Sequence, residues 1–226
     1  MKTSKFKCMV GAVPITAIIL SGQATFGQAV PVVNPSFESP STGLYTAGAA
    51  GSSAITGWTI GGGGDAGVWN VAGSSSIIAG AADGLQIGYI NPLGLTTVSQ
   101  TLTSDLQSDS TYTLSIDVTG RADGENPGTG YSVGLYAGGD LLASVTPETP
   151  GYGTWTDLSA TFTSGTVAPG EPLTIEISDW TAGGQLDFDN VTLTDPVGAG
   201  TLPDGGMTAM LLAGSLGALG WFRRKI

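Results

Sequence analysis

The sequence predicts an all-β protein, an antiparallel β-sandwich of the jelly-roll type, preceded by a signal peptide and followed by a single C-terminal hydrophobic helix. In the central part of the chain, apolar and polar residues alternate in short runs, which is the pattern of half-buried strands. Gly, Ser, Asn, Asp and Pro separate these runs, as turns between strands require. No helical period of useful length occurs before residue 203. About ten strands at this spacing indicate a sandwich.

Individual strands can be placed from this pattern. The alternation is clearest in four runs, at residues 112–118, 131–135, 158–162 and 173–177. The sequence Ala-Gly-Gly-Asp at 137–140 predicts a hairpin turn between strands at 131–136 and 141–145. Residues 32–38 are expected to form the first strand of the domain, and residues 186–195 the last.

The last strand carries an irregularity and a group of polar side chains. Its apolar phase slips by one residue after Phe188, which predicts a β-bulge at Asp189 and Asn190. The first strand ends in Glu38. Because oxygen ligands suit calcium, Glu38 and Asp189 are candidate ligands of a calcium ion that closes the sandwich. The alternative is that the neighbouring apolar residues are core and the acids are only solvated.

Residues 1–29 have the features of a secretory signal peptide. Three lysines precede an apolar run at 9–20, and Gly27-Gln28-Ala29 is a plausible cleavage site, with Gly22-Gln23-Ala24 as an earlier option. Cys8, the single cysteine, lies before the apolar run. The mature protein is therefore expected to have no disulfide and no cysteine metal site. The domain itself is expected at 30–196, followed by a linker at 197–201.

The charge of the central part is strongly one-sided. Arg121 is its only basic residue, against 17 acidic residues from Glu38 to Asp195, a net charge of −16. This argues against nucleic acid and anionic lipid as partners and favours cations and neutral ligands such as sugars. The chain also has no histidine, so any catalysis must use carboxylates, tyrosine or bound cations.

Two tryptophans flank a glycine-rich run at 61–65 and are expected in loops at one end of the sandwich. Aromatic faces suit sugar rings, and Asn supplies hydrogen bonds. We therefore expect a ligand site formed by the pairs Trp69 with Asn70 and Tyr89 with Asn91. The alternative is that the tryptophans plug the edge of the core, which fits Trp58 better than Trp69.

A set of short motifs in a shared order carries a family resemblance. They are residues 34–40 (Asn-Pro-Ser-Phe-Glu-Ser-Pro), 57–58, 67–70, 88–91, 99–102, 112–114, 135–138 and 188–191. Over about residues 30 to 195 the chain resembles bacterial galactose-binding-like jelly rolls, whose relatives include carbohydrate-binding modules and the hapalindole-type alkaloid cyclases. The resemblance implies a calcium-containing jelly roll with Glu38 and Asp189 at the ligand positions. It also implies, for a cyclase, a catalytic Asp in an apolar pocket, for which Asp187 and Asp189 are candidates.

The C-terminal segment, residues 202–226, has three parts in order. Pro203, Asp204, Gly205 and Gly206 precede an apolar run at 207–222, and a basic cluster ends the chain. This tail resembles the PEP-CTERM sorting signal that an exosortase recognises, with Pro-Asp-Gly-Gly in place of the family's Pro-Glu-Pro. The resemblance implies export, transient anchoring in the inner membrane, and then release to the cell surface or extracellular matrix. An ordinary C-terminal anchor is the alternative.

Three functions remain open from the sequence. The first is a surface or matrix protein that binds a sugar or polysaccharide and is not an enzyme. The second is an acid-catalysed enzyme of the cyclase type. The third is a structural matrix component without a specific ligand. An open site rimmed by Trp and Asn would favour sugar binding, whereas a deep apolar site with one buried Asp would favour a cyclase.

Overall fold

The computed structural model describes residues 28–44, 53–73, 76–78, 80–165 and 170–195. The expected signal peptide up to residue 27, most of the glycine-rich loop at 43–53, the linker and the sorting tail lie outside the described residues. Within the described residues there are eleven strands and one short 3-10 helix. The strands are β1 (Gln28–Ala29), β2 (Thr59–Gly62), β3 (Asp65–Asn70), β4 (Gln86–Asn91), β5 (Thr96–Asp105), β6 (Thr111–Thr119), β7 (Tyr131–Ala137), β8 (Asp140–Ser144), β9 (Thr156–Thr163), β10 (Pro172–Asp179) and β11 (Leu186–Asp195), and the helix is η1 (Val71–Gly73).

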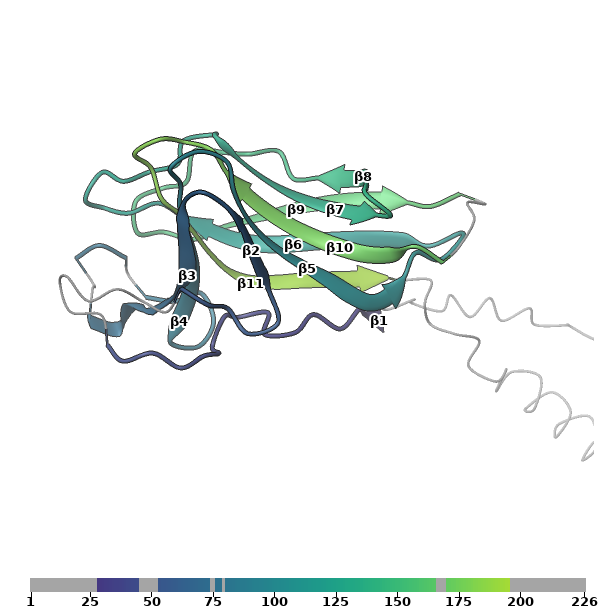
Figure 1. Cartoon of the computed structure of the whole chain (residues 1–226), viewed down its shortest axis with the longest axis horizontal. Helices are drawn as coiled ribbons and strands as arrows, with labels where there is room; N and C mark the ends of the chain where they lie inside the picture. The colour runs from purple at the N-terminus through teal and green to yellow at the C-terminus, as the bar shows by residue number, and fades with distance from the viewer. Residues whose placement is uncertain (1–27, 45–52, 74–75, 79, 166–169, 196–226) are drawn as a thin grey trace, which may run out of the picture.

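The strands form two packed antiparallel sheets, so the fold is the predicted all-β sandwich (Figure 1). One sheet has the order β3-β4-β11-β6-β9, with β1 added at the end of β11, and we call it the first sheet. The second sheet has the order β2-β5-β10-β7-β8. Neighbours in each sheet are mostly distant in sequence, which is consistent with a jelly roll.

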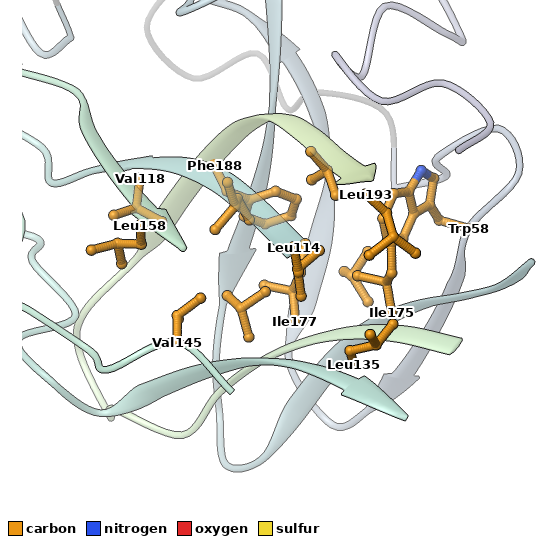
Figure 2. Packing of buried hydrophobic residues seen from close by; sticks show 14 of the residues in the cluster. Trp58, Leu114, Val118, Leu135, Val145, Leu158, Ile175, Ile177, Phe188 and Leu193 are labelled. Atoms are coloured by element: carbon orange, nitrogen blue, oxygen red, sulfur yellow. The ribbon is translucent and has the colours of Figure 1, made fainter. Parts of the chain in front are cut away.

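The inner faces of the two sheets bury one large apolar core, part of which Figure 2 shows. Phe188 on β11 packs edge-on against Phe37, with ring centroids 4.9 Å apart. Trp58 is only 7% exposed, packs against Phe37 and donates from Nε1 to the Val33 carbonyl oxygen at 3.0 Å. Trp58 is therefore a core residue, as the alternative from the sequence stated.

Several local predictions are confirmed. The four alternating runs lie on β6, β7, β9 and β10, and their apolar residues face the core. The hairpin between β7 and β8 turns at Gly138 and Gly139, both with positive φ, as a two-residue turn of this kind requires. The bulge in β11 is present as a register shift between Asp189 and Thr192, and Asn190 has a φ of 51°.

The predicted first strand at 32–38 is wrong. That segment is irregular, and Asn34 and Phe37 adopt positive φ. Pro31 and Pro35 lack the N–H group that a sheet ladder needs, so alternation alone could not produce a strand here. Beside the bulge in β11, the Val191 N–H donates a hydrogen bond to the Pro35 carbonyl of this segment at 2.9 Å.

No helix among the described residues is long and apolar enough to cross a membrane. The apolar run at 207–222 falls outside them.

Candidate functional site

The outer face of the first sheet carries a second, smaller apolar cluster. Its buried members are Trp69, Val71, Ile78, Ile87 and Tyr89, and the partly buried Ile77, Ala81 and Trp155 pack against them. These residues come from β3, β4 and the segment between them, with Trp155 added from the connection before β9. A sheet face that points away from the main core is normally solvated in an antiparallel sandwich. Here it is covered, which makes it the best candidate site.

Asp187 lies beneath this cluster. It is the register partner of Tyr89 across β11 and β4, so both side chains point to the same face. The Asp187 side chain is fully buried, and burial raises the pKa of its carboxyl group to about 7. A hydrogen bond from Gln185, the charge of Arg121 and the indole N–H of Trp69 act in the opposite direction. Burial thus favours the neutral, protonated form of this carboxyl group.

Gln185 and Arg121 fix the orientation of this carboxyl group. Gln185 donates from Nε2 to Oδ1 of Asp187 at 2.7 Å, and its Oε1 accepts a hydrogen bond from Arg121 at 2.9 Å. Oδ2 of Asp187 makes no hydrogen bond of good geometry within the described part of the chain. Arg121 also forms ion pairs with Asp123 and Glu125, at 2.5 Å and 2.9 Å. Arg121, the single arginine of the domain, is therefore held near the buried Asp187 by Gln185, Asp123 and Glu125.

The segment between β3 and β4 covers the site and is tied down at both sides. Trp155 donates from Nε1 to the Gly80 carbonyl at 2.9 Å, and the Ala122 N–H donates to the Ile77 carbonyl at 2.9 Å. These bonds hold the apolar side chains of the segment against Trp69 on β3 and against Ile87 and Tyr89 on β4. The arrangement excludes water from Asp187, and low local polarity strengthens every electrostatic interaction that the carboxyl group makes.

The structure brings together only part of the predicted sugar-binding set. Trp69 lies on β3 and is 4% exposed, so the expectation of a loop tryptophan is wrong. Trp69, Tyr89 and the exposed Asn91 share the outer face. Asn70 follows Trp69 in the same strand and therefore lies on the opposite face, where its Oδ1 accepts from the Ala72 N–H at 3.1 Å. Because side chains alternate along a strand, Trp69 and Asn70 point to opposite faces and cannot form one site.

Glu38 and Asp189, the predicted calcium ligands, converge on one short segment. Glu38 Oε1 accepts hydrogen bonds from the N–H groups of Leu85 and Gln86, at 2.7 and 2.8 Å. Asp189 Oδ2 accepts one from the Asp83 N–H at 2.9 Å. Asp189 is fully buried, and burial raises its pKa to about 7. The described residues contain no group of three or more acidic, His or Cys side chains that could hold a metal, so further ligands would have to be backbone or neutral oxygens.

Sequence reasoning missed Gln185, Arg121 and Trp155 as parts of a site. Gln185 precedes Asp187 by two residues, a spacing that places both on one face of an extended chain, and this signal was available. Arg121 stood out as the only cation of the domain, but its contact with Gln185 spans 64 positions and depends on the sheet order. Nothing in the local sequence of Trp155 indicates its partner.

Comparison with known proteins agrees with this architecture. A family model described as "HpiC1-like: HpiC1 cyclase" matches residues 28–194. A Stig cyclase from Fischerella sp. TAU, solved with (3Z)-3-(1-methyl-2-pyrrolidinylidene)-3H-indole, is similar with a TM-score of 0.64 and 24% identity, over 75% of this chain and 98% of that one. An apo cyclase from Fischerella sp. gives a TM-score of 0.66 and 24% identity, over 75% and 96% of the two chains.

A xylan-binding CBM22-1 domain from Paenibacillus barcinonensis Xyn10C is also similar, with a TM-score of 0.50 and 18% identity, over 76% of this chain and 97% of that one. At such identities these structures establish a shared fold. No curated protein matches the chain.

Proposed function

The chain belongs to the HpiC1-like cyclase family, and we propose that it is an enzyme that rearranges an apolar, electron-rich substrate with Asp187 as the catalytic acid. The observation that carries the proposal is the full burial of Asp187 beneath an apolar and aromatic cluster. A buried Asp covered by apolar side chains favours a cyclase over an open sugar site. This proposal differs from the first of the three functions that the sequence leaves open, a sugar-binding protein without catalysis.

In the proposed reaction, Asp187 gives a proton to the substrate and later takes one back. The O–H bond of neutral Asp187 breaks as a C–H bond forms on an unsaturated carbon of the substrate, which leaves a cationic substrate beside a carboxylate. After rearrangement, the substrate loses a proton to the same carboxylate. The net reaction is an isomerisation that needs no oxidant or reductant. The faces of Trp69 and Tyr89 would stabilise the positive charge on the substrate.

Gln185 and Arg121 would assist by holding the acid. A guanidinium group only donates hydrogen bonds, so its contact with Oε1 of Gln185 forces the amide Nε2 toward Asp187. Oδ1 of Asp187 must then act as an acceptor, and the transferable proton is carried on Oδ2. Gln185 is a positioning residue in this scheme, because it acts through Asp187.

Deuterium exchange tests this proposal without knowledge of the natural substrate. The probe is 4-(1H-indol-3-yl)butan-2-one, the compound present in another Fischerella cyclase structure. In D2O, the wild-type protein should catalyse loss of the indole C2 proton signal by NMR. Asp187→Asn should abolish the exchange, and Asp179→Asn, which changes a second fully buried acid at another place, should retain it. Exchange that persists in Asp187→Asn would exclude Asp187 as the acid.

A sugar site at the rim of the same face is a second candidate. Tyr89 donates from its hydroxyl to Asp65 at 3.1 Å, and burial together with Asp65 raises the pKa of Tyr89. Asp65 and Asn91 are exposed beside it and form register partners. Such polar groups around one phenol could bind the hydroxyls of a neutral polysaccharide. A glycan array with the wild-type protein and Asn91→Ala tests this, and equal binding of both forms, or none, would argue against it.

We also propose that Glu38 and Asp189 hold a calcium ion together with backbone carbonyls. The fit rests on a charge argument, because Asp189 is a fully buried carboxylate and Arg121, the only cation of the domain, is engaged elsewhere. A bound calcium ion would supply the missing positive charge. The calcium ion would then link Glu38 and Asp189 to the segment from Asp83 to Gln86.

Finally, we propose that the protein is exported and sorted by an exosortase. The support is the order of features in the sequence, with a signal peptide at 1–29 and the motif Pro203 to Gly206, an apolar run and a basic cluster at the other end. The C-terminal helix would anchor the chain briefly in the inner membrane before its release to the surface or matrix. Mass spectrometry of surface protein from the native host should find residues 223–225 missing, and their presence would refute sorting.

A further inference from the structure

Tyr89 has two different neighbours on the outer face of the first sheet. Its register partner on β11 is Asp187, and its register partner on β3 is Gly67. Because glycine has no side chain, no side chain of β3 stands directly opposite Tyr89. The Tyr89 hydroxyl donates to Oδ2 of Asp65, which lies two residues before Gly67 on the same face, at 3.1 Å. The side chain of Tyr89 therefore extends from the strand position beside Asp187 toward the beginning of β3.

The two ends of this hydrogen-bonded pair lie in different surroundings. Tyr89 is 7% exposed and belongs to the apolar cluster over Asp187, whereas Asp65 is exposed. Burial, followed by the negative charge of Asp65, raises the pKa of Tyr89, so the phenol keeps the proton that it donates. The bond thus ties a buried aromatic ring to an acid at the rim of the cluster.

Asp65 is itself held in a fixed place. It begins β3 and pairs with Asn91 of β4. The preceding residue, Gly64, donates from its N–H to Oγ1 of Thr96 at 3.0 Å. A Cβ atom on Gly64 would come within 2.3 Å of that oxygen, so the turn before β3 lies tightly against the start of β5. A residue fixed by its strand pairing and by the turn before it is a rigid anchor for a neighbouring side chain.

We propose that Asp65 is a positioning residue of the site, whose hydrogen bond to the phenol fixes the ring of Tyr89 beside Asp187. This inference rests on the proposed function, in which the faces of Trp69 and Tyr89 stabilise a positive charge on the substrate. Such stabilisation requires the charge to lie over the face of the ring, within about 6 Å of its centre. A ring that turns about its side-chain bonds loses this geometry, and the bond to Asp65 prevents the turn.

The role of Asp65 should show in kcat and not in KM. The positive charge develops only when the substrate takes a proton, so a correctly held ring stabilises the transition state more than the bound substrate. Asp65→Ala, which removes the acceptor, should lower kcat of the indole exchange by about 2- to 5-fold and leave KM nearly unchanged. Asp65→Asn keeps an acceptor oxygen and should retain most of the activity.

A double variant shows whether Asp65 acts through the phenol. Tyr89→Phe keeps the ring but removes the hydroxyl, so it should lower kcat as Asp65→Ala does. Because both changes break the same bond, the double variant should be no slower than either single variant. Additive losses would contradict the proposal, since Asp65 would then act independently of the hydroxyl. Asp140→Ala is the matched control, because Asp140 is an exposed acid on β8 of the second sheet, and it should leave kcat unchanged.

Proton NMR of the tyrosine hydroxyl groups tests the hydrogen bond directly and needs no substrate. The hydroxyl signal of Tyr89, assigned by its loss in Tyr89→Phe, should be present in the wild type and in Asp65→Asn. It should be absent in Asp65→Ala. The hydroxyl of Tyr131, which donates to the Glu148 carbonyl at 2.8 Å, is the internal reference and should give the same signal in every folded variant.

Two results would overturn the proposal. One is a hydroxyl signal of Tyr89 that survives in Asp65→Ala, and the other is a lost signal with an unchanged kcat. A wild-type protein without any indole exchange would refute the proposed enzyme instead. In that case the hydroxyl signals would still decide whether Asp65 holds the ring of Tyr89, so the two failures can be told apart.

Discussion

Gln185 donates a hydrogen bond from Nε2 to Oδ1 of Asp187 over 2.7 Å, while its own oxygen accepts one from Arg121. This relationship links the only cation of the domain to a fully buried acid through a neutral amide. A direct ion pair would stabilise the ionised carboxylate more strongly and lower its pKa. The intervening amide weakens the effect of Arg121 and allows burial to keep the pKa of Asp187 at about 7.

Replacement of Gln185 should therefore disturb the site. Gln185→Leu removes the bond to Asp187 and leaves Arg121 without one acceptor, which should lower the free energy of unfolding by about 1–3 kcal/mol. The exchange activity should fall as well, because the carboxyl group loses its fixed orientation. Chemical denaturation and the indole exchange assay measure the two effects.

Gln100→Leu provides the matched control. Gln100 is equally buried and makes two hydrogen bonds with Val33, but it lies on β5. The Gln100→Leu variant should be less stable than wild type, but its folded fraction should still catalyse the indole exchange. Equal loss of exchange in both variants would show that Gln185 has only a structural role.

Trp69→Ala should destabilise the protein, contrary to the expectation for a loop tryptophan. Trp69 is 4% exposed in the cluster over Asp187, and removal of such a side chain usually costs about 3–5 kcal/mol. Thermal melting measures the change. Trp180→Ala is the control, because Trp180 is 49% exposed, and it should have little effect. A Trp69→Ala variant as stable as Trp180→Ala would contradict the packing described.

Asp179, a second buried acid, should make the stability of the protein depend on pH. Burial raises the pKa of Asp179 from 3.8 to about 6, although the N–H and hydroxyl groups of Thr181 act against this. Because the folded state binds the proton more tightly, ionisation lowers stability progressively between pH 3.8 and about pH 6, and the loss is complete above that range.

Asp179→Asn should remove this loss. The variant should therefore melt higher than wild type at about pH 8, by the equivalent of at most about 3 kcal/mol, and show no gain at low pH. Asn can keep the acceptor that receives the Thr181 N–H, now at 2.8 Å. Melting curves over this pH range provide the test. A gain that is independent of pH would mean that the effect is not ionisation.

Calcium should raise the melting temperature of the wild-type protein, and a chelator should lower it. A ligand that binds only the folded state stabilises it by mass action. Glu38→Gln should weaken this response, since it removes a charged oxygen from the proposed site. Glu176→Gln, on β10 of the second sheet, should respond like wild type. Identical melting with calcium and with chelator would rule out the site.

Much of the fold follows from local pattern, and the failures have physical causes. Tyr112 to Val118 alternates because each second residue faces the core, and the bulge at Asn190 follows from the phase slip that precedes Val191. The irregular segment around Pro35 shows that missing backbone N–H donors can prevent a strand even where apolar and polar residues alternate. The site was harder to predict, because Asp187 gains its environment from Tyr89 and Trp69, which sheet pairing brings to it from about a hundred residues away.

The central claim is that Asp187 is a buried acid that holds a proton near neutral pH. Carbon-13 NMR of its side-chain carboxyl carbon, identified by the signal that Asp187→Asn removes, follows its ionisation directly. The account predicts a midpoint at about 7, because burial outweighs Gln185, Arg121 and Trp69. A midpoint at the ordinary value of about 4 would show a permanently ionised carboxylate and contradict acid catalysis by Asp187.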